Sequence, residues 1–338
     1  MLVWQSLGAA IDRHGKAALV SVLAVAGSAP REAGARMIVM PDGSFTGTIG
    51  GGTLEWRAIA EAQRALAGEA RASLALTSVA LGPDLGQCCG GRVELAIERW
   101  GADRRAALRI LAEAEAAGPF RTEAEILAGQ PIERRILAMG DVPIGGARLV
   151  KRRLEEGFGE DPRALFLFGA GHVGRALVLA LAPLPFSVRW IDPRPDAFPA
   201  RVPANCRCIQ QTDAPGVLRA APDGAFVVVM THSHALDLAI VHKALTEGRF
   251  SYVGLIGSAS KRARFMRLLG EAGLEGDKIQ SMHCPIGIAG IHSKLPAVIG
   301  ASVASDLLVR DEAARNAGTS ATDELHDVLI RVPRESGT

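Results

Sequence analysis

The sequence predicts an α/β protein whose C-terminal half forms a parallel sheet, and three observations support this. Strand-like apolar segments alternate with helical segments through that half, which is the pattern of a parallel sheet with helical crossovers. A glycine-rich turn follows the first of these strands and opens a helix. The 338 residues, of which 48% are hydrophobic, are enough for two domains that each bury a core.

The N-terminal half mixes strand and helix patterns, and we expect it to be a mixed α/β domain. Residues 53–66 have the apolar spacing of an amphipathic helix, with Thr53 as its N-cap. An Ala-, Glu- and Arg-rich segment predicts a second helix over 103–117. The predicted strands of this half are 17–26, 36–40, 74–80 and 93–97, with a turn at 41–44.

We place the domain boundary in segment 153–163, which contains two glycines, a proline and an acidic bias. This gives an N-terminal domain of residues 1–160 and a C-terminal domain of residues 161–338. The second domain has predicted strands at 164–168, 187–191, 206–210, 225–230 and 252–256, and predicted helices that end near 181 and span 235–247 and 260–272.

Composition and charge exclude several classes of protein. A net charge of +2 and 4% aromatic residues argue against a strongly basic nucleic-acid binder and against an acidic disordered tail. No apolar run reaches the roughly 18 residues of a membrane span, and the N-terminus does not have the pattern of a secretory signal. Five cysteines, two of them adjacent, favour reduced thiols over a disulfide scaffold. We therefore expect a cytoplasmic protein that binds neither nucleic acid nor membrane.

The glycine-rich turn of the second half is Gly169, Gly171 and Gly174, and Asp192 ends the next predicted strand. This spacing is typical of a Rossmann-like fold, where the glycines admit a phosphate to the N-terminus of a helix. His172 lies inside the turn and either faces a ligand or caps the helix. The alternative is a tight strand-to-helix turn without a ligand.

A second glycine cluster, Gly50, Gly51 and Gly52, precedes the helix predicted at 53–66. Three successive glycines cost backbone entropy, so they indicate either the close approach of a ligand or a cap turn. The sequence supports the ligand approach and the cap turn equally. Glu55 comes one residue too early for a Ser/Thr-x-x-Glu capping box that begins at Thr53.

The most specific short feature is Gln87, Cys88 and Cys89, followed by two glycines. Adjacent thiolates on such a loop can bind a soft metal or carry sulfur. A zinc site is not indicated, because no second ligand pair has ordinary zinc spacing. We expect the C-x-C pair at Cys206 and Cys208, on a predicted strand, to be structural.

Polar residues follow two further strands of the second half. His232 lies in THSHALD, whose spacing does not fit a metallo-β-lactamase site. We expect a polar lip on a ligand crevice, and the alternative is an N-capped helix with solvated histidines. Lys261 and Arg262 suit an acidic group or are solvated charges.

Seven segments of the chain, taken together, are more specific than any one of them. They are GSAPREAGARMIV, DGSFTGTIGGGTLE, GPDLGQCCGG, the glycine turn followed by IDPR, THSHALD, VGLIGSASKR and CPIGIAG. Their order resembles the XdhC/CoxI family, and within it the branch of xanthine dehydrogenase accessory proteins. The resemblance covers residues 27–308, but 291–296 read IHSKLP where many members have a more acidic helix start.

The resemblance implies a dimeric protein that binds and protects the molybdenum cofactor rather than an enzyme that turns over a substrate. It implies sulfuration of the cofactor with a NifS-like cysteine desulfurase and delivery to the molybdenum-binding subunit of xanthine dehydrogenase. Cys88 and Cys89 become candidate ligands on the molybdenum side. The other candidate cofactor-binding residues are Gln87, Gly50, Gly51, Gly52, Gly169, Gly171, His172, Gly174, Asp192 and His232.

Two alternatives remain open from the residues themselves. The first is an NAD(P)-dependent oxidoreductase, in which Asp192 binds a ribose 2′-hydroxyl, beside Arg194, and His172 or His232 acts as acid or base. The second is a nucleotide-sensing or interaction protein without catalytic activity.

Overall fold

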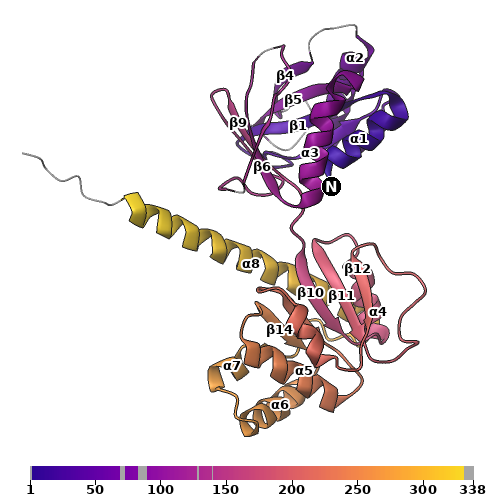
Figure 1. Ribbon diagram of the computed structural model, residues 1–338, viewed down its shortest axis with the longest axis vertical. Helices are drawn as coiled ribbons and strands as arrows, with labels where there is room; N and C mark the ends of the chain where they lie inside the picture. The colour runs from indigo at the N-terminus through magenta and orange to yellow at the C-terminus, as the bar shows by residue number, and fades with distance from the viewer. Residues whose placement is uncertain (1, 69–72, 83–89, 128, 139, 331–338) are drawn as a thin grey trace, which may run out of the picture. The chain divides into compact units, whose positions relative to one another are not determined.

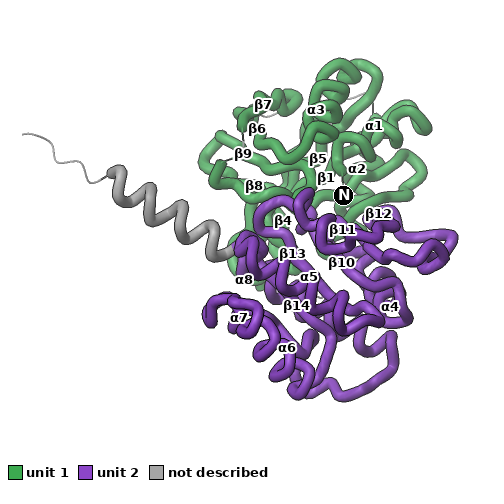
Figure 2. Tube along the Cα trace, turned by 60° about the horizontal axis from the view of Figure 1, so that its bottom comes forward, with its two compact units in different colours: residues 1–161 green, residues 162–338 purple. Residues whose placement is uncertain are grey.

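A computed structural model describes residues 2–330 except 69–72, 83–89, 128 and 139, and for 316–330 it describes the backbone alone. The chain divides into two compact units, residues 1–161 and 162–338, coloured separately in Figure 2. Each unit has its own sheets and its own apolar core. The predicted α/β class is confirmed.

Unit 1 contains two antiparallel sheets (Figure 1). The first has the order β3 (Phe45–Gly47), β2 (Arg36–Val39), β1 (Lys16–Ala26), β5 (Arg92–Gly101) and β4 (Leu74–Ala80). The second has the order β7 (Arg135–Leu137), β6 (Phe120–Glu125), β9 (Arg153–Phe158) and β8 (Ala147–Val150). Its helices are α1 (Val3–His14), α2 (Gly52–Ala67) and α3 (Arg105–Ala117), with a 3-10 turn at Ala102–Arg104.

Strand β1 is apolar on both faces because helices cover both faces of its sheet. Ala18 and Val20 pack with Leu54 of α2 in one buried cluster. Leu19 points to the other face and packs with Trp4 of α1. Alternation along one strand thus builds a three-layer arrangement, as the period of two requires.

The elements of unit 1 differ from the prediction in several places. Strand β9 occupies Arg153–Phe158, inside the segment 153–163 in which the domain boundary was placed. Its Glu156 is fully buried against Arg36 and Arg134. Helix α1 and strands β3 and β6–β8 were also not predicted, and these strands have only three to six residues.

Unit 2 contains one parallel sheet, as predicted for a Rossmann-like domain. The order is β12 (Cys206–Gln210), β11 (Phe186–Asp192), β10 (Arg163–Phe168), β13 (Phe226–Val229), β14 (Tyr252–Leu255) and β15 (Met282–His283). The helices are α4 (His172–Ala180), α5 (His234–Glu247), α6 (Ala259–Glu271), α7 (Gly276–Gln280) and α8 (Pro296–Ile330), with a 3-10 segment at Pro215–Ala220.

The strand order reverses at β10, which lies between β11 and β13. In open α/β sheets, ligands bind beyond the carboxyl ends of the strands at such a switch point. The two faces of the sheet are covered separately. Phe166 packs with Ile240 of α5, whereas Leu167 packs with Leu177 of α4 and Leu307 of α8. The switch point is therefore held between two packed layers.

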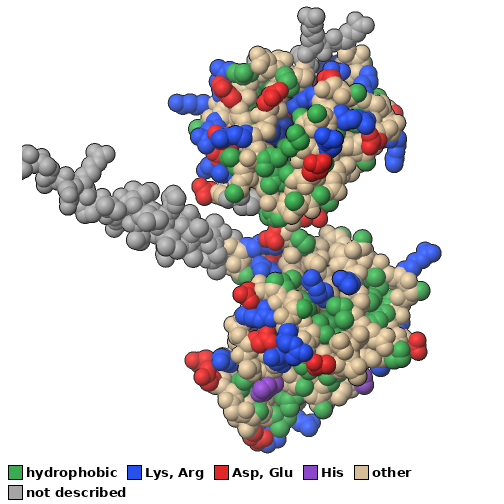
Figure 3. All heavy atoms as spheres, viewed as in Figure 1, with side chains coloured by type: hydrophobic (Ala, Val, Ile, Leu, Met, Phe, Trp, Pro, Cys, Tyr) green, Lys and Arg blue, Asp and Glu red, His purple; other side chains and the backbone are tan. Residues whose placement is uncertain are grey.

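The surface carries no single dominant charge on the side that Figure 3 shows, where Lys and Arg side chains are interspersed with Asp and Glu in both units. This agrees with the net charge of +2. Among the described residues, none of the helices combines the length and apolar character needed to cross a membrane.

Candidate functional site

The glycine turn between β10 and α4 depends on glycine at two positions for the fold itself. Gly169 has a φ of +112°, and a Cβ there would lie 2.3 Å from the carbonyl oxygen of Met230. A Cβ at Gly174 would lie 2.2 Å from the carbonyl oxygen of Gly169. These two glycines allow the tight turn and the close packing of α4 on the strand ends.

Gly171 has a different role, because a Cβ there would meet nothing within 4 Å. It is the N-cap of α4, and no side chain of the described residues caps that end. The turn borders a cavity of about 550 Å³ that Arg194, Thr231 and His232 also line. The unpaired N–H groups and positive dipole end of such a helix start favour an anion.

Asp192 supports this turn and is almost fully buried. Its Oδ2 accepts a 2.7 Å hydrogen bond from the Ala170 amide, and its Oδ1 accepts from the amide and Nε of Arg194 at 3.0 and 2.9 Å. Burial alone would raise the pKa of Asp192, but the hydrogen bonds from Arg194 and Ala170 outweigh burial and lower it. Both carboxylate oxygens of Asp192 are engaged, and the charged residues that line the cavity are Arg175, Asp196 and the half-exposed Arg194.

The segment THSHALD follows β13, where the sequence predicted either a polar lip on a crevice or an N-capped helix. Ser233 is the N-cap of α5 and accepts a hydrogen bond from the Leu236 amide. His232 is exposed and lines the cavity. Buried Asp237 accepts from Thr231 Oγ1 at 2.7 Å. The polar lip is therefore also a capped helix start.

Lys261 pairs with an acidic group, as one of its two expectations stated, but the group belongs to the chain itself. Its Nζ lies 2.8 Å from Oδ2 of buried Asp237 and also donates to the carbonyl of Ile256. The ammonium is neither a solvated charge nor available to an external phosphate. This pair joins the starts of α5 and α6, a contact that a separation of 24 residues does not reveal.

The glycine turn of unit 1 is closed by the chain's own carboxylate. Oε2 of Glu55 accepts hydrogen bonds from Thr48 Oγ1 at 2.6 Å, from the Ile49 amide at 3.1 Å and from the Gly51 amide at 3.3 Å. Gly51 is the N-cap of α2, so the expectation that Thr53 caps this helix was wrong. Glu55 occupies the place that an external anion would take, and a ligand role for Gly50, Gly51 and Gly52 stays a prediction.

Gln87, Cys88 and Cys89 lie outside the described residues, and their roles stay predictions. Burial raises the pKa of Cys206 to about 12 and also raises that of Cys208, so these thiols are protonated, in keeping with a structural role. In the part of the chain that the structure describes, no group of three or more His, Cys, Asp or Glu side chains could hold a metal ion.

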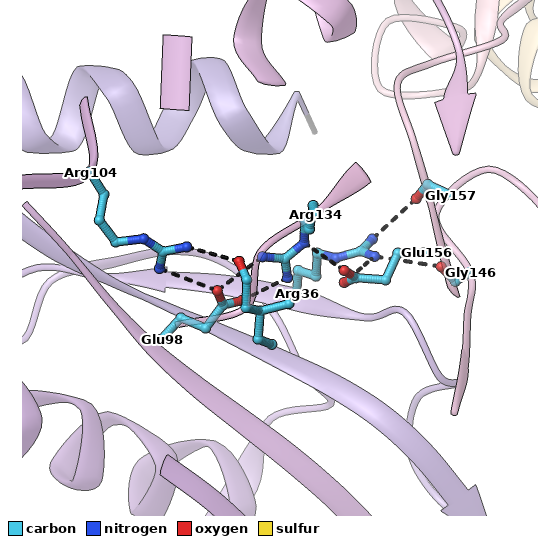
Figure 4. Close-up of polar contacts among 8 residues, drawn as sticks. Arg36, Glu98, Arg104, Arg134, Gly146, Glu156 and Gly157 are labelled. Atoms are coloured by element: carbon cyan, nitrogen blue, oxygen red, sulfur yellow. Dashed lines mark hydrogen bonds and ion pairs between the residues drawn. The ribbon is translucent and has the colours of Figure 1, made fainter. Parts of the chain in front are cut away.

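Sequence reasoning missed the buried cluster of Arg36, Glu98, Arg104, Arg134 and Glu156 in unit 1 (Figure 4). Its members come from separate segments, and the pair Arg36–Glu156 spans 120 positions. No local sequence pattern marks these residues as partners.

Comparisons with known proteins agree with both units. The model described as the XdhC Rossmann domain matches residues 165–307, and the model of the XdhC and CoxI family matches residues 10–77. The uncharacterized protein YqeB of Escherichia coli K12 is 27% identical over 297 residues, which are 86% of this chain and 43% of that protein. This chain therefore spans less than half the length of that relative.

A solved structure has the same fold. It is described as a xanthine dehydrogenase from Bacillus halodurans, and it superimposes with a TM-score of 0.74 at 20% sequence identity. The match covers 93% of this chain and 96% of that chain.

Proposed function

Because this chain belongs to the XdhC and CoxI family, we propose that it is an accessory protein that binds the molybdenum cofactor and protects it. In this role it supports sulfuration of the cofactor and delivers it to xanthine dehydrogenase. The protein carries a reactive compound and does not itself turn over a substrate.

The cavity beside Gly171 carries this proposal. The cofactor is a pterin with a phosphate group and a molybdenum atom held by two sulfurs. The uncapped start of α4 and the Arg194 guanidinium suit its phosphate, and the absence of a Cβ at Gly171 lets the ligand approach the backbone. His232 at the same cavity provides a polar contact.

Soft thiolates suit molybdenum, and Cys88 and Cys89 of unit 1 are the candidate ligands. When bound, the cofactor would supply a molybdenum centre whose chemistry is used by the recipient enzyme. In unit 2, the start of α4 and Arg194 would hold the phosphate. In unit 1, Cys88 and Cys89 would present thiols for the exchange of sulfur, with Gln87 as a polar contact beside them.

The partners in this proposal are a NifS-like cysteine desulfurase, the molybdenum-binding subunit of xanthine dehydrogenase and a second copy of the chain. The setting is the cytoplasm, which suits thiols that must stay reduced.

The direct test is to incubate the purified protein with molybdenum cofactor, remove free cofactor, and measure bound molybdenum and pterin together. Gly171→Val should reduce bound pterin at least tenfold, because its side chain enters the cavity. Gly276→Val is the matched control, since a Cβ at that glycine of unit 2 also meets nothing within 4 Å. Equal loading of Gly171→Val and wild type would remove the α4 cavity from the proposal.

The cysteines are tested in the same assay. The Cys88→Ala, Cys89→Ala double variant should retain pterin but lose molybdenum more rapidly. Unchanged retention of both would exclude the thiols from holding the metal.

A second candidate function follows from the position of the cavity at the switch point of the sheet, where dinucleotides bind. Since Asp192 is already paired, Arg194 favours a ribose that carries a phosphate, so NADP should bind more tightly than NAD. Calorimetry with both dinucleotides, followed by a search for substrate-dependent hydride transfer, tests this candidate. If neither NAD nor NADP bound, this candidate function would be excluded.

A further inference from the structure

Unit 1 contains a cavity of about 720 Å³ that neither the glycine turns nor the proposed function uses. Its walls are formed by residues 31–36, 47–48, 143–147 and 157–159, together with Val3, so all of them lie in unit 1. We call it the Arg36 cavity. Its volume is in the range of about 300–1,000 Å³ that is typical of small-molecule sites.

Arg36 lines this cavity, and its guanidinium lies over the ring of Phe158, 4.1 Å from the ring centroid. Its side chain is only 4% exposed, and its Nη2 lies 3.1 Å from Oε1 of Glu156. Its other hydrogen bonds, to the carbonyls of Gly157 and Gly146, are long at 3.4 and 3.5 Å (Figure 4). The Arg36 Nε is buried and has no hydrogen-bond partner among the described residues. A buried donor without a partner costs free energy that a ligand can recover.

The carboxylates around Arg36 are shared with other arginines. Arg134 donates to both carboxylate oxygens of Glu98 at 2.7 and 2.9 Å. Its Nε also donates to Oε2 of Glu156 at 2.7 Å. Arg104 approaches Glu98 at 3.6 Å. The cluster therefore contains three arginines and two glutamates.

Within the cluster, the one carboxylate that pairs with Arg36 is Glu156, which Arg36 shares with Arg134. Glu133 acts on Arg104 at the other end of the cluster. The carboxylate at the rim of the cavity, Glu32, is paired with Arg31 at 3.0 Å. Burial lowers the pKa of Arg36 and Glu156 opposes this effect, so another anion beside the guanidinium would stabilise its charge further.

We infer that the Arg36 cavity binds a small organic anion, whose carboxylate or phosphate group lies at the Arg36 guanidinium and whose organic part fills the remaining space. A guanidinium is suited to both groups because its N–H donors form a planar fork. The backbone allows close approach, since a Cβ at Gly145 would meet nothing within 4 Å. This site is separate from the α4 cavity of unit 2 and does not depend on the proposed function.

The test is a titration of the full-length ¹⁵N-labelled protein, observed through the Arg36 Nε–H resonance, which is assigned through bonds from the Arg36 backbone amide. The probes are inorganic phosphate and succinate. We expect at least one of them to shift this resonance saturably, and the probe that binds more tightly identifies the anionic group. If neither probe shifts the resonance, the inference is overturned.

Variants separate this site from the rest of the molecule. Ala33→Leu adds volume at a wall residue without touching the charged cluster, and it should weaken the response at least tenfold. Ile144→Trp does the same from another wall segment if Ala33→Leu fails to fold. Ala107→Leu, on the exposed face of α3, is the matched control and should respond like wild type.

Gly171→Val should also keep the response, because it changes unit 2 only. The proposed function can therefore fail in the cofactor-loading assay while this site binds its probe, and the reverse result is equally distinguishable. If Ala33→Leu shifted the Arg36 Nε–H resonance as wild type does, the anion would bind elsewhere and the inference would be contradicted.

Discussion

The two glycine-rich turns of this protein precede helices in the same way but end in different states. In unit 1, Glu55 accepts hydrogen bonds from Thr48, Ile49 and Gly51, and so neutralises the start of α2. In unit 2, no side chain of the described residues caps the start of α4, which borders a cavity of about 550 Å³.

The fourth residue after each N-cap accounts for this difference. It is Glu55 after Gly51 in unit 1 and Arg175 after Gly171 in unit 2. A carboxylate at this position satisfies the helix start from within and repels an external anion. Arg175 instead donates to the carbonyl of Ala197 and leaves the helix start open. A glycine cluster therefore does not predict a ligand site unless the residue one turn later is also considered.

The largest effect should come from Gly169→Ala, which we expect to cost unit 2 about 3 kcal/mol or more. The substitution forces a side chain onto a φ of +112° and against the backbone of Met230. Gly51→Ala should cost less, about 1–2 kcal/mol, because a φ of +75° strains alanine but the surroundings of Gly51 are empty. Urea unfolding measures both, and a Gly169→Ala midpoint equal to that of Gly51→Ala would contradict the packing argument.

The next effect is on binding. Arg175→Glu places a carboxylate where unit 1 has Glu55 and should lower cofactor loading about tenfold, or about 1.4 kcal/mol. Arg175→Gln loses the same bond to Ala197 without adding negative charge, so it should bind nearly as wild type. If the two variants bind equally, the charge at this position does not control access to α4.

Removal of the internal carboxylate should have a smaller effect. Glu55→Ala leaves the amides of Ile49 and Gly51 without their partner and should destabilise unit 1 by about 1 kcal/mol. Glu113→Ala is the control, because Glu113 is exposed and pairs with Arg109 on its own helix at 3.7 Å. Thermal unfolding of both variants gives the comparison, and equal midpoints would show that Glu55 does not hold the turn.

The smallest effect is the pH dependence of the Asp192–Arg194 pair. Because the folded pKa of Asp192 is lowered, its stabilisation is complete above its unfolded pKa of about 3.9 and is lost as pH falls through the folded value. Arg194→Ala should remove less than about 1 kcal/mol at neutral pH, since Arg194 is half exposed. The variant and wild type should then converge in stability once the pH is below the lowered folded pKa of Asp192. A difference that persists at acid pH would assign the effect to packing instead of charge.

The sequence predicted much of the fold because the signals for it are local. The alternation of strands and helices and the spacing of Gly169, Gly171 and Gly174 predict the parallel sheet of unit 2 and the position of its cavity. The same approach did not find β9, because two successive glutamates are not typical of a buried strand and the arginine partners of Glu156 lie far away in the sequence. It also misplaced the cap of α2, because Glu55 acts from inside the helix.

Local patterns by themselves determined the two-part α/β organisation, the strands of the Rossmann-like sheet and the glycine turn that opens α4. Only the tertiary structure decided which distant charges meet: Asp237 with Lys261, and Glu156 with Arg36. The physical reason is the range of the interactions. Backbone hydrogen bonding and the period of burial act over a few residues, whereas the partner of a buried charge depends on which distant surfaces pack together.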